Sequence, residues 1–285
     1  MTIEKSCIML LCLFSLTITC SKKDQTIDPN PAPEGYSLVW SDEFNSDGAP
    51  NPSNWSFEQG FVRNRELQWY QESNARCENG LLIIEGKRER VSNPNYQANS
   101  DDWQKNRQYA EYTSSSLHTR GLHSWMFGVF EMRARIDTRP GLWPAFWTLG
   151  VNGQWPHGGE IDIMEYYQGT LLANVAWGDT EPWKAVWDSA RKPLSAFIDP
   201  EWATWFHLWK MEWDEKAIYL YMDDLLMNIT DLSTTINRDA EKKNPFLQPH
   251  YLIVNLAIGG DAGGDPSAIV FPARYEIDYI RIYQK

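Results

Sequence analysis

Cysteine is scarce in this chain of 285 residues. Three of the four cysteines, Cys7, Cys12 and Cys20, lie within the first 20 residues, which leaves Cys77 alone in the remainder. A single cysteine cannot form an internal disulfide, so we interpret Cys77 as a core thiol. No group of cysteine and histidine residues has the spacing of zinc ligands, which argues against a structural zinc site.

Positive charge is the second shortage. The chain has 26 Lys and Arg residues against 38 Asp and Glu residues, which gives a formal net charge of −12 at pH 7. Phosphate groups would be repelled by this excess, so the composition argues against a general nucleic-acid binder. It also weighs weakly against highly sulfated polysaccharides as substrates, although a local basic patch could override the overall charge.

Long apolar runs are almost absent. Residues 1–19 contain Lys5 and then an apolar stretch, which is too short for a transmembrane helix and predicts a secretory signal. Cys20 follows at once and precedes polar residues, as in a bacterial lipoprotein in which Cys20 is acylated. Ile18 and Thr19 are larger than is usual before such a cysteine, so ordinary secretion is the alternative. We therefore expect an exported lipoprotein of the bacterial cell envelope, at the outer membrane.

The rest of the chain predicts a tether and one large domain. Residues 20–35 follow the signal, and residues 24–35 are polar and hold three prolines, as in an extended linker. Residues 36–285 show neither a linker composition nor an internal repeat. Recurrent short apolar segments and few helical patterns favour an all-β sandwich, with an insertion at 183–205 that includes a short helix. We expect strands at 37–40, 80–88, 111–118, 127–136, 145–149, 160–166, 171–177, 206–213, 217–222, 250–257 and 277–283.

Three acids occur within six residues of a β-branched run. Ile161 alternates with Glu160 and Asp162, so a period of two places the acids on one face of a strand and the apolar residues on the other. Glu165 breaks that alternation. We infer a β-bulge at residues 163–164, which returns Glu165 to the face of Glu160.

Carboxyl groups held this close together repel one another, which separates their pKa values. One ionised and one protonated acid is the equipment for glycoside hydrolysis, and in the retaining version one acts as nucleophile and the other as acid/base. The alternative is a solvated edge strand whose acids discourage pairing. Fifteen tryptophans favour the first interpretation, because aromatic rings pack on the apolar faces of sugars.

The acid motif and its surroundings resemble glycoside hydrolase family 16, in the branch with a bulged strand that includes laminarinases and related β-glucanases. The resemblance rests on Glu-Ile-Asp-Ile-Met-Glu at 160–165, on Gly-Leu-Trp-Pro-Ala-Phe-Trp at 141–147, and on matching segments at 40–44 and 275–283. It covers residues 36–285. It implies a β-jelly-roll sandwich with a sugar-binding cleft on its concave sheet. It also implies Glu160 as nucleophile, Asp162 as its helper and Glu165 as general acid/base.

The same resemblance implies a set of residues that contact the substrate. Each has a structural alternative: a capped turn for Asn64, a surface ion pair for Arg133 and a satisfied core histidine for His207. Many laminarinases carry a histidine on the strand after the acid motif, whereas this chain has Asn174 and Trp177 in that region. The substrate-binding candidates are Asn64 and Glu66 on the glycone side, Arg133 near the nucleophile, Trp143 and Trp147 beside the acids, Asn174, Trp177 and His207.

A structural calcium ion is a further implication of the resemblance. Glu43, Gly80 and Asp278 match positions that hold calcium on the convex side of family members, with hard oxygen ligands from both ends of the chain. Few carboxylates are available there for a dedicated site. No cofactor is expected to be required for catalysis.

The leading hypothesis is a retaining endo-β-glucanase that acts on β-1,3-glucan (laminarin), on mixed-linkage β-1,3/1,4-glucan, or on both. One alternative is a hydrolase of galactans such as agar, carrageenan or porphyran. A second alternative is a non-catalytic glycan-binding lipoprotein, against which the intact Glu160 and Glu165 argue. The expected partners are the polysaccharide and the membrane, without nucleic acid, and we expect a monomer.

Overall fold

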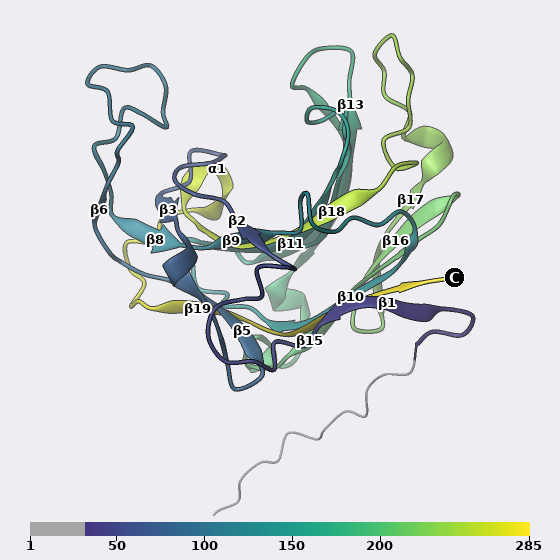
Figure 1. Ribbon diagram of the computed structural model, residues 1–285, viewed down its shortest axis with the longest axis horizontal. Helices are drawn as coiled ribbons and strands as arrows, with labels where there is room; N and C mark the ends of the chain where they lie inside the picture. The colour runs from purple at the N-terminus through teal and green to yellow at the C-terminus, as the bar shows by residue number, and fades with distance from the viewer. Residues whose placement is uncertain (1–31) are drawn as a thin grey trace, which may run out of the picture. The chain divides into compact units, whose positions relative to one another are not determined.

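The computed structural model describes residues 32–285, which form two antiparallel sheets packed face to face (Figure 1). The sheet that carries the acid motif, called here the cleft sheet, has seven strands in the spatial order β14-β13-β12-β11-β18-β9-β2. They are β14 (Ala185–Pro193), β13 (Thr170–Gly178), β12 (Glu160–Tyr167), β11 (Leu142–Gly150), β18 (His250–Ile258), β9 (Ser116–His118) and β2 (Ser56–Phe57).

The second sheet, called the outer sheet, has the order β17-β16-β15-β10-β19-β5-β4, and β1 also pairs with β19. Its strands are β17 (Leu225–Asp231), β16 (Ala217–Met222), β15 (His207–Trp213), β10 (Gly128–Arg135), β19 (Ala273–Gln284), β5 (Leu81–Gly86), β4 (Ala75–Glu78) and β1 (Ser37–Asp42). This pair of sheets confirms the predicted all-β sandwich.

Short elements connect the two sheets. Two small pairs lie outside them: parallel β3 (Gln68–Tyr70) with β8 (Tyr112–Ser114), and antiparallel β6 (Val91–Ser92) with β7 (Tyr109–Ala110). The helical turns are η1 (Glu72–Asn74), η2 (Leu194–Ala196), η3 (Trp202–Thr204), η4 (Leu232–Thr234) and α1 (Gly260–Gly263). No helix within 32–285 is long and apolar enough to cross a membrane.

The core lies between the sheets because strands of both present alternate apolar side chains to each other. In the cleft sheet, Ile161 and Tyr166 of β12 are buried there. In the outer sheet, β10 contributes Phe130 and Met132, and Cys77 of β4 is also buried among these side chains, as predicted. Burial of this apolar surface is the main stabilising term, and it leaves the opposite face of the cleft sheet free to carry polar residues.

The insertion predicted at 183–205 is mainly a strand. Residues 185–193 pair along the whole length of β13 as β14, and only the two short turns η2 and η3 follow. The sequence of 185–193, Ala-Val-Trp-Asp-Ser-Ala-Arg-Lys-Pro, does not alternate apolar and polar residues, so no period of two marked it as a strand. The predicted short helix corresponds to the short 3-10 turns η2 and η3. Strand β17 was also missed. The predicted signal segment, tether and acylated Cys20 lie almost wholly outside the described residues and stay predictions.

Candidate active site

The bulge in β12 is present where the alternation of the sequence breaks. Phe146 of β11 pairs with Met164, and the next residue of β11 pairs with Asp162, so Ile163 has no partner. Ile163 and Met164 both face the core, and both are almost fully buried. The extra residue returns Glu165 to the cleft face, which confirms the predicted bulge.

Strand register places each acid in a row of side chains that crosses the sheet. Glu160 pairs with Ala176, Asp162 pairs with Asn174, and Glu165 pairs with Leu172. The same rows continue onto β14 and β11. The full rows are Trp187–Ala176–Glu160–Leu149, Ser189–Asn174–Asp162–Trp147 and Arg191–Leu172–Glu165–Ala145.

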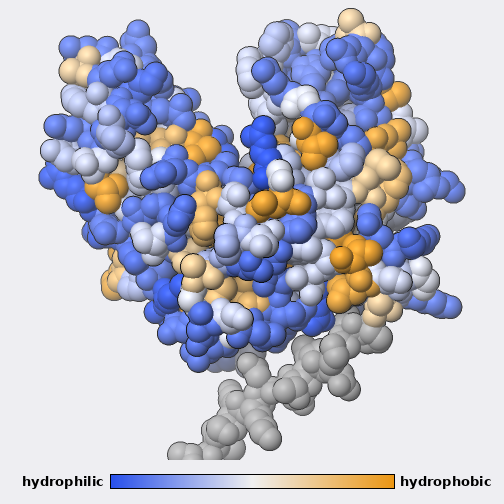
Figure 2. Space-filling model, in the orientation of Figure 1, coloured by the Kyte–Doolittle hydropathy of each residue, from blue (hydrophilic) through white to orange (hydrophobic). Residues whose placement is uncertain are grey.

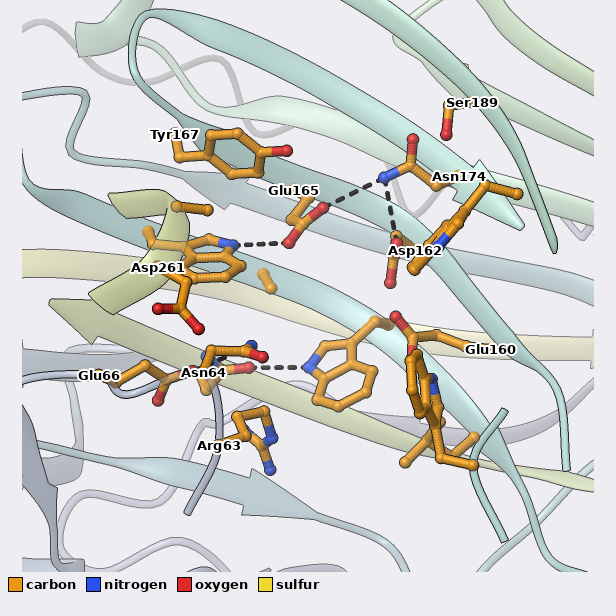
Figure 3. Close-up of a pocket in the computed structure, with 18 of the residues that line it drawn as sticks. Arg63, Asn64, Glu66, Glu160, Asp162, Glu165, Tyr167, Asn174, Ser189 and Asp261 are labelled. Carbon is orange, nitrogen blue, oxygen red and sulfur yellow. Dashed lines mark hydrogen bonds between the residues drawn. The ribbon is translucent and has the colours of Figure 1, made fainter. Parts of the chain in front are cut away.

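A cavity of about 750 Å³ lies over these rows. The segment at 63–66 closes one side and β14 lies at the other, with the three acids between them (Figure 3). Figure 2 shows the molecular surface divided by a notch between two raised parts. The cavity lining is largely aromatic and carboxylate, which is the chemistry expected of a site for sugars. It comprises Arg63, Asn64, Glu66, Trp143, Ala145, Trp147, Leu149, Trp155, Glu160, Asp162, Glu165, Tyr167, Asn174, Trp187, Ser189, Arg191, Asn255, Asp261 and Ala262.

Glu160 has partners that stabilise its ionised form. The indole N–H of Trp155 donates a hydrogen bond to Glu160 Oε2 at 2.6 Å. Burial, and then the charge of Glu165, raise the pKa of Glu160 to about 7, while the hydrogen bonds from Asp162 and Trp155 act in the opposite direction. Glu160 is therefore able to ionise near neutral pH.

Burial also favours the protonated forms of Asp162 and Glu165. Asp162 is only 4% exposed, and burial and the neighbouring Glu160 raise its pKa well above the usual value. Burial and the charge of Asp162 likewise raise the pKa of Glu165 well above its usual value. All three acids are thus shifted toward their protonated forms, which makes a proton donor available at neutral pH for acid/base catalysis.

Asn174 and Trp143 fix the geometry of the protonated acids. The amide nitrogen of Asn174 lies 3.1 Å from Asp162 Oδ2 and 3.2 Å from Glu165 Oε2, so one side chain bridges both (Figure 3). The indole N–H of Trp143 donates to Glu165 Oε1 at 2.6 Å. The structure therefore brings Asn174 and Trp143 directly against the acids, as predicted for site residues.

The segment at 63–66 forms the wall opposite β14. Asn64 has a φ of 53°, the left-handed conformation that asparagine tolerates, and this tight turn carries it into the cavity. Glu66 is buried, and its carboxylate accepts a hydrogen bond from Gln68 at 2.6 Å. Trp147 donates its N–H to Asn255 at 2.8 Å, and the Arg63 guanidinium lies 5.0 Å from its ring centre. Asn64, Glu66 and Trp147 all line the cavity.

Three predicted substrate contacts were wrong. Arg133 lies on β10 of the outer sheet, where it forms an ion pair with Asp278 at 2.5 Å. His207 lies on β15 of that sheet, hydrogen-bonded to Asp223 at 2.8 Å and stacked on Trp202. Trp177 of β13 is in the core, because it alternates with Asn174 and Ala176 and therefore points to the opposite face. The structural alternatives considered for Arg133 and His207 are the correct ones.

The carboxylates proposed for calcium already have positively charged partners. Glu43 accepts two hydrogen bonds from Arg281, at 2.8 and 2.7 Å, and Asp278 is held by Arg133. Within residues 32–285, no group of three or more His, Cys, Asp and Glu side chains is arranged for a metal ion. These side chains as placed do not fit a carboxylate calcium site. An ion beside Gly80 would have to use main-chain oxygens or displace the arginines, and it stays a prediction.

Several cavity residues were not predicted. On β14 these are Trp187, Ser189 and Arg191, whose spacing of two residues would have indicated one face of a strand. Trp155 precedes the acid motif by only five residues, yet its hydrogen bond to Glu160 depends on the fold of the loop between them. Asn255 comes from a strand far away in the sequence, and no local signal marks it.

Comparison with known proteins agrees with this geometry. The model of the family described as glycosyl hydrolases family 16 matches residues 85–281. A beta-glucanase of Rhodothermus marinus is 35% identical over 289 residues, covering 95% of this chain and 93% of that protein.

Two solved structures share the fold over most of their length. The laminarinase from Rhodothermus marinus has a TM-score of 0.71 at 35% identity, with 87% of this chain and 97% of that chain covered. A structure from work on endo-acting O-glycanases with which gut bacteria initiate mucin breakdown has a TM-score of 0.80 at 34% identity, with 88% and 92% covered.

Proposed function

Because the chain belongs to glycosyl hydrolases family 16, we propose that it is a retaining endo-β-glucanase for β-1,3-glucan and mixed-linkage β-1,3/1,4-glucan. The single observation that carries the chemistry is the set of three acids on β12, in which the pKa of Glu160 is raised to about 7 and burial favours the protonated form of Glu165. A nucleophile and a proton donor thus lie in the same cavity.

The reaction proceeds by double displacement. Ionised Glu160 attacks the anomeric carbon while protonated Glu165 gives its proton to the glycosidic oxygen, so the bond to the leaving sugar breaks and a glycosyl ester forms on Glu160. Glu165, now ionised, takes a proton from water. As that proton leaves, the water oxygen attacks the anomeric carbon and the ester bond to Glu160 breaks, so Glu160 is ionised again and Glu165 is protonated again. Asp162 shares a hydrogen bond with Glu160 and steadies it as its charge changes.

The cavity suits attack within a chain rather than at its end. It crosses the sheet from the 63–66 segment to β14, and the indoles of Trp143 and Trp187 lie along it. Several sugar units can therefore bind at once, with ring faces against aromatic side chains. We expect short oligosaccharides of mixed length as the early products.

A second candidate substrate is an O-glycan of mucin. The observation that favours it is the TM-score of 0.80 to the structure from the O-glycanase work, against 0.71 to the laminarinase. In this interpretation the catalytic acids keep their roles. Only the sugars accepted beside β13 and β14 differ.

The first prediction concerns substrate choice. Purified protein incubated with laminarin, cereal mixed-linkage glucan, cellulose, agarose and mucin O-glycans should release reducing ends from the first two, because the acids and the aromatic cleft match β-glucan cleavage. Product sizing should show mixed oligosaccharides, and NMR of the first products should show the β-anomer.

Glu160→Gln is the matched control, since the amide keeps the shape of the side chain but is not nucleophilic. It should reduce turnover to below about 1% while laminarin binding persists. Cleavage of mucin O-glycans with both glucans untouched would replace the glucanase proposal by the second candidate. An α-anomer product would refute double displacement.

A further inference from the structure

Strand β14 presents a platform, a hydroxyl and a positive charge to the cavity. Trp187, Ser189 and Arg191 occupy alternate positions of this edge strand, all three are exposed, and all three line the cavity. The indole of Trp187 is 46% exposed, so a broad apolar surface is open to a ligand. Ser189 and Arg191 have no role in the reaction described above, and Trp187 enters it only as a surface for sugar rings.

Arg191 differs from the other arginines at this site. Arg63 is half-buried and paired with Glu58, and Arg65, next to the cavity-lining Asn64, pairs with Asp261 at 3.1 Å. Arg191 forms no ion pair or hydrogen bond with any residue of the described part of the chain. An exposed guanidinium has five donors in a rigid fork that matches oxyanions such as carboxylate and sulfate.

The position of Arg191 relative to the acids indicates which sugar it would meet. Arg191 lies in the row of Glu165, two strands away, so their Cα atoms are about 10 Å apart at the usual strand spacing. It stands on the side of the acids opposite the 63–66 segment (Figure 3, where Ser189 marks the position of β14). With the 63–66 segment on the glycone side, β14 contacts sugars of the leaving part of the chain.

We propose that Trp187, Ser189 and Arg191 form an aglycone subsite for a sugar that carries one anionic substituent, a sulfate or a carboxylate. This inference rests on the proposed glycoside hydrolase function and refines its substrate. Trp187 stacks on a sugar ring, Ser189 meets a ring hydroxyl, and Arg191 binds the anion through charge-assisted hydrogen bonds.

The subsite is built for a sparsely substituted glycan. The chain carries a net charge of −12, and the cavity itself holds Glu66, Asp261 and the three acids of β12. A polyanion would meet repulsion along the whole cleft. One unpaired arginine at the end of a row of side chains offsets a single negative group there.

The simpler role for Arg191 is to act on Glu165 alone. Its positive charge lowers the pKa of Glu165, against the larger effect of burial. That role predicts an equal change for neutral and anionic substrates when Arg191 is replaced. A subsite predicts a change in the ratio of activity on anionic substrates to activity on neutral substrates, so one measurement distinguishes the two roles.

The second prediction compares paired substrates on the full chain. Native laminarin is set against laminarin lightly sulfated at C6 and against laminarin lightly oxidised at C6 to carboxylate. For Arg191→Gln, the ratio of kcat/KM on the anionic member to that on its neutral partner should fall about tenfold, as expected for loss of a charge-assisted contact. The sulfate and carboxylate arms identify which anion is recognised.

Lys192→Gln is the matched control, because it removes the same charge from the same strand on the face away from the cavity, where Lys192 lies 5.3 Å from the ring of Phe197. It should leave the ratio unchanged. An equal loss on neutral and anionic substrates in Arg191→Gln, or the same change in Lys192→Gln, would overturn the subsite.

If the proposed glucanase function is wrong, the wild-type protein will not cleave native laminarin, and this result is distinct from those that test the subsite. In that event, affinity electrophoresis of Glu160→Gln with and without Arg191→Gln decides the matter on the same polymers. Retardation by an anionic polymer that exceeds retardation by its neutral partner, and that requires Arg191, supports the subsite. Equal retardation of the two proteins refutes it.

Discussion

At the scale of single residues, identical carboxyl groups acquire different roles from their neighbours. Burial and a neighbouring acid raise the pKa of both Glu160 and Glu165, while an indole N–H, from Trp155 to Glu160 and from Trp143 to Glu165, acts in the opposite direction. Burial disfavours the charged form, and donors to a carboxylate favour it. The tryptophans of the cleft therefore act on the acids as well as on the sugar rings.

The third prediction follows from that contact. The profile of kcat/KM against pH should be bell-shaped, with an acid limb near pH 7 from Glu160 and an alkaline limb from Glu165. Trp155→Phe removes the donor to ionised Glu160, so its pKa rises and the acid limb should move upward by up to about one pH unit. Initial rates on laminarin between pH 4 and 10 measure this.

Trp183→Phe controls for the loss of an indole, because Trp183 is 64% exposed and does not line the cavity. Its profile should match that of the wild type. A Trp155→Phe profile with an unmoved or lowered acid limb would mean that the hydrogen bond to Glu160 does not govern ionisation.

At the scale of elements, one unpaired residue in β12 decides which side chains face water. Beyond Ile163 the strand presents Met164 to the core and Glu165 to the cavity, the reverse of what strict alternation would give. The neighbouring β11 and β13 hold this register along both sides of β12. The bulge is therefore part of the site.

The fourth prediction tests which way residues 164 and 165 point by exchanging their side chains, which leaves the amino-acid composition unchanged. In the double substitution Met164→Glu and Glu165→Met, the carboxyl enters the core between the sheets, so the free energy of unfolding at neutral pH should fall by about 3 kcal/mol or more. Urea denaturation followed by tryptophan fluorescence measures the change, and activity should vanish.

Glu165→Met alone is the matched comparison, because it removes the acid without burying one. It should lose activity and yet keep a stability close to that of the wild type. Equal stability of the single and double variants would show that residue 164 does not face the core.

At the scale of the whole molecule, local patterns in the sequence predicted much of the architecture. Short apolar segments between turn signals located most long strands, including β10, β13 and β18, and the break in the alternation of the acid motif located the bulge. The contacts of Asn174 and Trp143 with the acids agree with their prediction as site residues. These features depend on residues within one strand or on a motif of a few residues.

The wrong predictions share a physical reason. Arg133 and His207 have sequence surroundings like those of site residues, but the assignment of β10 and β15 to the outer sheet depends on pairing between distant segments. The prediction for Trp177 was wrong because the face of the sheet to which its side chain points depends on the register of β13 against β12. The role of β14 emerged only when its pairing with β13 carried the rows of the acids outward.

The fifth prediction concerns the cost that the site imposes on the fold. The pKa of Glu160 is about 7 in the folded protein and about 4.3 in an unfolded chain, so between these pH values the folded state binds more protons. The free energy of unfolding therefore falls as pH rises through this range. The destabilisation by Glu160 is absent below about pH 4. Because Glu160 is only half-buried and is coupled to its neighbours, the effect is on the order of 1 kcal/mol.

Glu160→Gln removes the penalty, so its melting temperature should exceed that of the wild type by about 2–4 °C at pH 8, with a smaller difference at pH 5. Glu201→Gln removes the same charge from an exposed position and should show no such pH-dependent gain. A Glu160→Gln protein that melts below the wild type at pH 8, or by the same margin above it at both pH values, would contradict the raised pKa. The expected gain would show that the ionised nucleophile is maintained at the expense of stability, because its burial among the other acids of β12 destabilises the charged form that catalysis requires.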